Sequence, residues 1–194
     1  MLTDFQKTCL NLAKNSILQE FGMWDPYKIQ INDPQFQEKR ACFVTLKMDG
    51  ELRGCIGSIV PHNKLYEDII TNAKNAAFQD PRFPQLNLDE IQENDLNIGI
   101  TILSPIQDKE FSNHSDLLNF LTKEKCWLII KLWYRQATFL PSVREELPQA
   151  NEFITHLLLK AWISINEFQN DFDKFKFQIY YWEEFKSDRE SISW

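Results

Sequence analysis

The sequence contains few of the residues that mark linkers, disorder or membrane spans. Only 5 glycines and 8 prolines occur among its 194 residues, so we expect no flexible linker, and each of them should have a positional meaning. No apolar run approaches the roughly 18 residues that a membrane-spanning helix needs. The first residues also lack the basic and apolar regions of a signal peptide. We therefore expect a cytoplasmic protein with no membrane partner.

Basic residues and paired cysteines are also scarce. Lys and Arg number 21 against 28 Asp and Glu, and the resulting net charge of −7 makes nucleic acid an unlikely partner. The cysteines form no CxxC pair, so reduced thiols are expected rather than a disulfide framework; they are Cys9, Cys42, Cys55 and Cys126. A zinc site built from these cysteines and the three histidines lacks any recognised ligand spacing, so we expect no metal site.

Aromatic and aliphatic residues are, by contrast, abundant. Hydrophobic residues make up 43% of the chain, with 15 phenylalanines and 6 tryptophans, which is ample material for a well-filled core. A chain of this length buries most of the surface that it would expose when unfolded. We expect residues 1–194 to form a single domain, either as one body or as two closely associated lobes.

Helices are predicted where apolar residues recur every three or four positions, and strands where they alternate with polar ones. Thr3 can cap the first helix, and helical spacing recurs in residues 65–76 and 153–161. Alternation predicts strands over residues 96–102 and 175–181. Because helices and hairpins are interspersed without βαβ regularity, the pattern favours a mixed α+β fold with mainly antiparallel sheets packed with helices.

The Asp-Gly dipeptide at 49–50 is the strongest turn signal, because this pair favours the two-residue turn of a β-hairpin. Such a turn places Leu46 opposite Arg53 and Val44 opposite Cys55, so all four side chains would share one face of the hairpin. Both faces then carry apolar residues. We therefore expect Arg53 to be largely buried and bound to a carboxylate or to backbone carbonyls.

Two glycines flank the cysteine of this strand. Gly54 and Gly57 remove side chains at positions where another backbone, or a ligand, could approach closely. Together with Arg53 and Cys55 they predict that the strand forms one wall of a binding site.

Residues 52–57, Leu-Arg-Gly-Cys-Ile-Gly, resemble the hallmark string of the AMMECR1 family. Further blocks resemble that family in the expected order, at residues 43–46, 76–83, 140–143 and 159–161. The resemblance implies an α+β unit of two lobes with antiparallel sheets. Some members occur beside, or fused to, Memo-type and radical-SAM proteins, which makes proteins of these kinds expected partners by resemblance. No activity or cofactor is implied.

The sequence departs from the family pattern at two positions. Ser142 stands where members tend to have Gln, and Trp162 stands where they tend to have Gly. Exchange of Gly for Trp adds a large amphipathic ring, so we expect any pocket near that helix to be reshaped or filled.

Cys55 allows two interpretations. As a thiolate activated by Arg53 it would be a catalytic nucleophile, since a nearby cation lowers the pKa of a thiol. As a small residue in a tight sheet it would be buried and inert, which is the commoner situation for a free cysteine. His62, after the strand, would have to fold back to act as its base.

The proline-bounded loop that follows the second predicted helix supplies two more candidates. Asp80 and Arg82 can clamp a polar ligand, or they can pair with each other and stabilise the loop. Lys160, near the end of a later helix, completes the set of predicted ligand-binding residues.

Three classes of function follow from these residues. The first, which we favour, is an accessory module whose cleft beside residues 52–57 binds a small polar ligand or a segment of a protein partner. The second is an enzyme that uses Cys55 in chemistry linked to radical-SAM or Memo-type proteins. The third is an RNA-associated regulatory factor that uses exposed aromatic residues and a local basic patch, a reading that the net acidity weakens.

Overall fold

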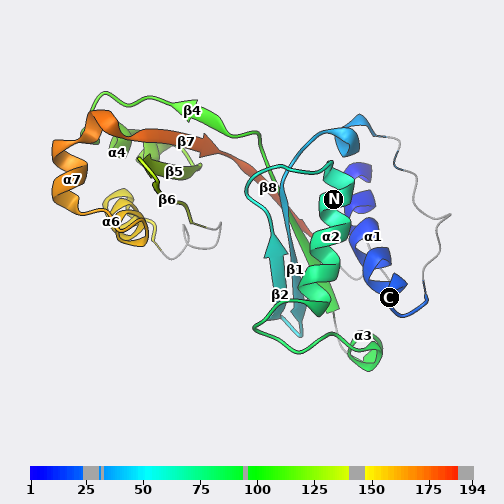
Figure 1. The fold of residues 1–194 in the computed structure, drawn as a ribbon. Helices are drawn as coiled ribbons and strands as arrows, with labels where there is room; N and C mark the ends of the chain where they lie inside the picture. The colour runs from blue at the N-terminus through cyan, green and yellow to red at the C-terminus, as the bar shows by residue number, and fades with distance from the viewer. Residues whose placement is uncertain (24–30, 32, 94–95, 140–146, 188–194) are drawn as a thin grey trace. The chain divides into compact units, whose positions relative to one another are not determined.

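The structure, a computed structural model, describes residues 1–23, 31, 33–93, 96–139 and 147–187. The chain divides into two compact units, and unit 1 is discontinuous in sequence: it comprises residues 1–104 and 182–194, whereas unit 2 comprises residues 105–181. Each unit packs helices with a four-stranded antiparallel sheet (Figure 1), so the predicted α+β fold is confirmed. No helix in the described parts of the chain is both long and apolar enough to span a membrane.

The sheet of unit 1 has the strand order β2-β1-β3-β8. Its strands are β1 (Cys42–Met48), β2 (Glu51–Gly57), β3 (Leu96–Leu103) and β8 (Trp182–Lys186). Alternate residues of the two central strands are buried, among them Val44 and Leu46 of β1 and Ile98, Ile100 and Ile102 of β3. Since β1 and β3 lie inside the sheet, β2 is left at one edge.

Helices α1 (Asp4–Gln19) and α2 (Leu65–Phe78) pack against each other and against this sheet (Figure 1). Thr3 caps α1, as predicted, and the cap is a capping box: the Thr3 hydroxyl accepts a hydrogen bond from the Gln6 backbone amide, and the Gln6 side chain accepts one from the Thr3 backbone amide. The short helices η2 (Pro34–Gln37) and α3 (Leu88–Glu93) complete the described elements of this unit.

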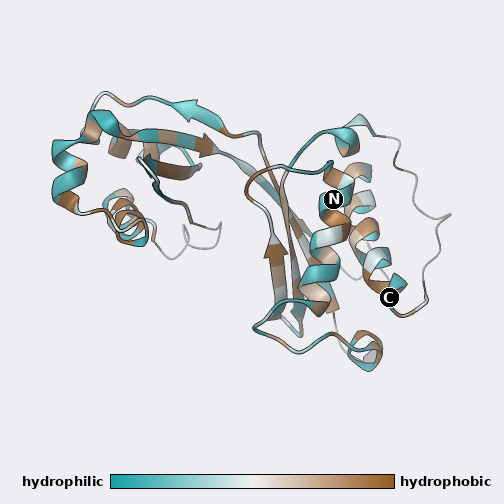
Figure 2. Ribbon diagram, viewed as in Figure 1, coloured by the Kyte–Doolittle hydropathy of each residue, from teal (hydrophilic) through white to brown (hydrophobic). Residues whose placement is uncertain are grey.

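Unit 2 contains the second sheet, with the order β4-β7-β5-β6. Its strands are β4 (Gln107–Lys109), β5 (Trp127–Leu132), β6 (Arg135–Ala137) and β7 (Lys176–Tyr180), and its helices are α4 (His114–Lys123), α6 (Ala150–Lys160), α7 (Ile165–Asn170) and η3 (Phe172–Lys174). Figure 2 shows the predicted alternation along β7, whose apolar and polar residues take turns, and a hydrophilic β4 at the edge.

Some features had no prediction, or lie beyond the described residues. Neither α7 nor β8 was predicted, because α7 is only six residues long and β8 has two adjacent glutamates. The family-like block at residues 140–143, with Ser142, lies outside the described residues.

Candidate functional site

The β1–β2 hairpin has the predicted turn. Asp49 and Gly50 both have positive φ angles, 51° and 88°, which are the backbone conformations of a type I′ turn. An Asp-Gly pair suits this turn because glycine, and to a lesser extent aspartate, adopts a positive φ at low cost. The predicted hairpin tip is therefore confirmed.

The predicted register beyond the turn is wrong. A β-bulge leaves Arg53 without a residue opposite it, so Leu46 lies opposite Gly54 and Thr45 lies opposite Cys55. The inference that Arg53 and Cys55 share one face of the hairpin no longer follows. The bulge instead brings Gly54 opposite a fully buried residue, on the side of the strand where α2 packs.

Arg53 is largely buried and bound to a carboxylate, as predicted, with only 8% of its surface exposed. Its guanidinium binds Glu90 of α3 with two hydrogen bonds, from Nε to Oε1 at 2.9 Å and from Nη2 to Oε2 at 3.1 Å. These bonds hold the pKa of Glu90 below its usual value. The Asn87 amide also donates to Glu90, so Arg53 anchors the start of α3 to the edge strand.

Asp80 and Arg82 bind the open edge of β2 at Cys55. The buried Asp80 carboxylate accepts the Cys55 amide through Oδ2 at 2.9 Å, and Arg82 donates from Nη2 to the Cys55 carbonyl oxygen at 3.0 Å. Arg82 also donates to both carboxylate oxygens of Asp80, which, together with the Cys55 amide, lowers the Asp80 pKa well below its usual range. The two side chains thus pair with the edge strand as a neighbouring strand would.

The Cys55 side chain itself is half-buried, and its Sγ lies 3.3 Å from Thr45 Oγ1. The guanidinium of Arg82 binds the backbone carbonyl oxygen of Cys55, whereas the guanidinium of Arg53 is paired with Glu90. His62 is exposed and makes no hydrogen bond with Cys55. All four cysteines are free thiols.

Both glycines of the motif are required by close packing. A β-carbon on Gly54 would collide with the Ala76 carbonyl oxygen of α2, and one on Gly57 would collide with the Phe43 ring and stand 2.6 Å from the Cys42 carbonyl oxygen. Of the alternatives left open by the sequence, Gly54 makes room for the backbone of a helix, and Gly57 makes room for a side chain and a strand.

A buried polar network, not predicted from the sequence, lies near the N-terminal end of α2. Oδ2 of the buried Asp68 accepts hydrogen bonds from the Cys42 backbone amide at 2.9 Å, the Ser58 hydroxyl at 2.8 Å and the Asn72 side-chain amide at 3.0 Å. Burial, together with Asp68, raises the pKa of the Cys42 thiol well above its usual value. The available signal was the pair of polar residues four positions apart on an otherwise apolar helix face.

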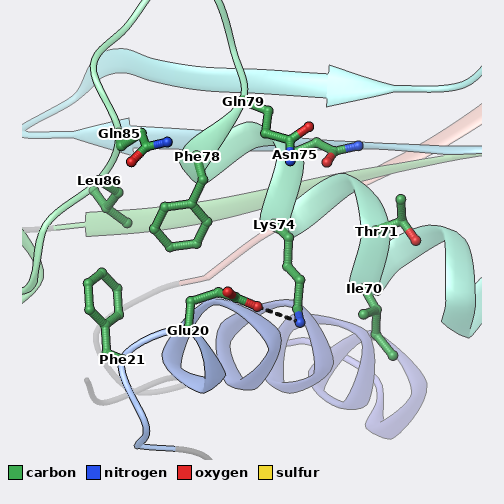
Figure 3. A pocket seen from close by; sticks show the side chains of 10 residues that line it. All are labelled: Glu20, Phe21, Ile70, Thr71, Lys74, Asn75, Phe78, Gln79, Gln85 and Leu86. Carbon is green, nitrogen blue, oxygen red and sulfur yellow. Dashed lines mark ion pairs between the residues drawn. The ribbon is translucent and has the colours of Figure 1, made fainter.

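Unit 1 also contains a pocket of about 700 Å³ between the C-terminal ends of α1 and α2 (Figure 3). Its apolar lining residues are Phe21, Ile70, Phe78 and Leu86, and its polar ones are Glu20, Thr71, Lys74, Asn75, Gln79 and Gln85. Figure 3 shows the ion pair between Lys74 and Glu20, whose charged atoms are 2.7 Å apart. None of the lining residues was predicted from the sequence.

The predicted site residues are therefore brought together only in part. Arg82, Asp80 and Cys55 are in direct contact, whereas Lys160 belongs to unit 2, where its Nζ donates to the Thr138 carbonyl oxygen. Among the described residues, no cluster of three or more His, Cys, Asp or Glu side chains could hold a metal ion.

The protein belongs to the α+β class, because each of its two antiparallel sheets packs with helices. The arginine and the glycines of its hairpin serve close packing. The model of the AMMECR1 family matches residues 10–183. A protein of Methanosarcina barkeri is 36% identical over 167 residues, which cover 83% of this chain and 81% of that protein. A protein of Thermotoga maritima is 34% identical, over 74% of this chain and 78% of its own length.

The crystal structure of an uncharacterized protein from Pyrococcus horikoshii has the same fold, with a TM-score of 0.74 at 25% identity, over 97% of this chain and 94% of that one. The chain belongs to the AMMECR1 family.

Proposed function

We propose that the protein is an accessory module that binds an extended, uncharged segment of a partner protein in the pocket between α1 and α2. One observation carries this proposal: the pocket combines apolar walls with neutral polar side chains, and its lining residues Lys74 and Glu20 neutralise each other in an ion pair. Pockets of about 300 to 1,000 Å³ with such a lining are typical of ligand sites in proteins.

The lining follows two stripes along α2. Ile70, Lys74 and Phe78 recur at intervals of four residues, and Thr71, Asn75 and Gln79 form a second stripe beside them. The side-chain amides in the second stripe can each donate and accept hydrogen bonds. The backbone of an extended peptide carries N–H donors and C=O acceptors. A sheet edge or a groove can bind such a peptide by hydrogen-bonding these groups one after another.

The charge of the pocket favours an uncharged segment. Lys74 is the cation of the lining, and it is bound to Glu20 at 2.7 Å and to the Gln19 side chain at 2.9 Å. A charged ligand group would have to displace one partner of this pair. An apolar anchor side chain, by contrast, fits beside the Phe21 and Phe78 rings, whose centres are 5.7 Å apart.

Cys55 of β2 helps to hold the loop that supplies part of the pocket lining. Its contacts with Asp80 and Arg82 hold the start of the loop that follows α2, and Gln79, Gln85 and Leu86 of the same stretch line the pocket. The Leu86 amide donates to the Ala77 carbonyl oxygen at 2.8 Å, which fixes the far end of the loop on α2. In this proposal Arg53, Gly54 and Cys55 are positioning residues.

A library of short synthetic peptides tests the proposal, with dissociation constants measured by calorimetry for the peptides that bind. Thr71→Trp places a large ring at the exposed rim of the pocket and should weaken binding by at least about tenfold. Thr122→Trp is the matched control, because Thr122 is also an exposed helical threonine but lies in unit 2. It should bind like the parent.

Cys55→Ser separates this proposal from an enzyme that uses the thiol. A positioning role predicts that the variant binds the same peptides with an affinity within about twofold of the parent. Failure of every peptide to bind, or equal binding by Thr71→Trp and the parent, would overturn the proposal.

A further inference from the structure

Two exposed tryptophans of unit 2 occupy backbone conformations that favour glycine. Trp133 has a φ of 56° and Trp162 a φ of 58°, and their side chains are among the most exposed apolar groups, at 76% and 87%. A left-handed conformation is unfavourable for any residue with a β-carbon. Exposure of a large ring adds no packing in return, so neither tryptophan is explained by folding.

The local geometry shows why glycine would fit. Trp133 is the first residue of the two-residue turn that joins β5 to β6, a place where a positive φ normally calls for glycine. Trp162 follows the end of α6 in a Schellman motif: its amide donates to the Leu159 carbonyl oxygen, and the Ile163 amide donates to that of Leu158. The Trp162 ring is exposed rather than packed in the interior, and whether it reshapes or fills a pocket stays a prediction.

The two tryptophan sites are joined by Arg135. Its Nη1 donates to the Trp162 carbonyl oxygen at 2.8 Å, and its Nη2 donates to Glu167 Oε1 at 2.7 Å. Arg135 directly follows Tyr134, whose side chain is 90% exposed. We call the exposed residues of this region the aromatic surface: Trp133, Tyr134, Leu159, Trp162 and Ile165.

Two lysines of the sheet lie near Trp133, at one end of this surface. Lys131 lies two residues before Trp133 and directly opposite Lys176 of β7. Like charges in opposite positions of a sheet repel each other. Neither lysine forms an ion pair with a carboxylate in the described parts of the chain. An acidic group bound between them would relieve the repulsion.

We infer that the aromatic surface binds an acidic segment of a second protein, one that carries at least one apolar anchor side chain. Its carboxylates pair with Lys131 and Lys176, and its anchor packs on the indole rings. Trp and Tyr are the residues that most often dominate protein interfaces. Two lysines in a chain of net charge −7 suit a short acidic stretch, whereas nucleic acids and anionic membranes demand several basic residues together.

Short fluorescein-labelled peptides rich in Glu with a single Leu, Phe or Trp serve as the probe, alongside the same peptides with Gln in place of Glu. Fluorescence anisotropy should show binding that weakens by about tenfold or more when Glu is replaced by Gln. Trp162→Gly should weaken binding by a similar factor while its melting temperature equals or exceeds that of the parent, since glycine relieves the backbone strain. This second readout separates loss of the surface from loss of the fold.

Charge reversal supplies a matched control. Lys131→Glu with Lys176→Glu should abolish binding of the acidic peptides, whereas Lys123→Glu with Lys125→Glu, which changes the net charge of the same unit equally, should leave it unchanged. Equal binding of the Gln peptides would overturn the inference. So would tighter binding to anionic lipid vesicles or single-stranded RNA than to the acidic peptides, or self-association of the chain through this surface in sedimentation experiments.

Discussion

Replacement of Arg53 tests the energetic role of the motif most directly. In Arg53→Ala the protein loses two charge-assisted hydrogen bonds to Glu90, at 2.9 Å and 3.1 Å. Each such bond contributes about 1.5 to 3 kcal/mol. Glu90 keeps the bond from the Asn87 amide, and its side chain is 23% exposed, so water can solvate part of the unpaired carboxylate. We therefore expect a loss near the low end of the range for a broken buried pair, about 3 kcal/mol.

Urea unfolding followed by tryptophan fluorescence measures this loss, and a chain of this size should melt about 6 to 12 °C lower. Arg53→Lys keeps the charge but loses the planar fork of two donors, so it should recover less than half of the stability. A double-mutant cycle with Glu90→Ala should give a coupling free energy of about 2 kcal/mol. A parent-like melting curve for Arg53→Ala would show that the pair is solvated, and our structural account of the motif would fail.

Three further predictions concern the neighbours of Arg53. Gly54→Ala should cost about 2 to 3 kcal/mol because its β-carbon meets the Ala76 carbonyl oxygen, whereas Gly99→Ala, with its nearest atom 3.8 Å away, should cost under about 1 kcal/mol in the same urea assay. Cys55→Ala should stay within about 1 kcal/mol of the parent; a larger loss would mean that the thiol has a packing role. Asp80 has a lowered pKa, so its ionised form stabilises the fold above the unfolded pKa of about 3.9, and this contribution is lost as the pH falls toward the folded value. Asp80→Asn should be less stable at neutral pH and should show a shallower loss of stability in acid; parallel pH profiles would contradict this.

The hairpin shows how far the sequence alone could predict the site. The Asp49-Gly50 turn is a local signal and was predicted correctly, as was the burial of Arg53. The bulge was missed because it depends on packing against α2. The Ala76 carbonyl oxygen of that helix lies close to Gly54, although the two residues are far apart in the sequence. Tertiary packing therefore decides the register of the hairpin beyond the turn, and the sequence of the hairpin alone does not predict it.

Partners separated widely in sequence were also beyond prediction. Glu90 follows Arg53 by 37 residues, and nothing in the pattern distinguishes it from the other acidic residues of its segment. The loop with Asp80 and Arg82 was recognised as a candidate, and their pairing with each other was one of two stated alternatives. The pocket was missed because its lining comes from three separate stretches of chain, each with an ordinary amphipathic composition.

The division of unit 1 into two sequence segments has a consequence for how the protein is made. Leu103, at the end of β3, lies opposite Trp182, at the start of β8, so unit 2 is an insertion whose two ends meet at one strand pair. During synthesis, β3 emerges long before β8 exists to cover its edge. Unit 2 is contiguous and can fold first on the ribosome, whereas the sheet of unit 1 is completed only when the last strand arrives. A premature stop before β8 would therefore leave an intact unit 2 attached to a sheet with an exposed, apolar edge.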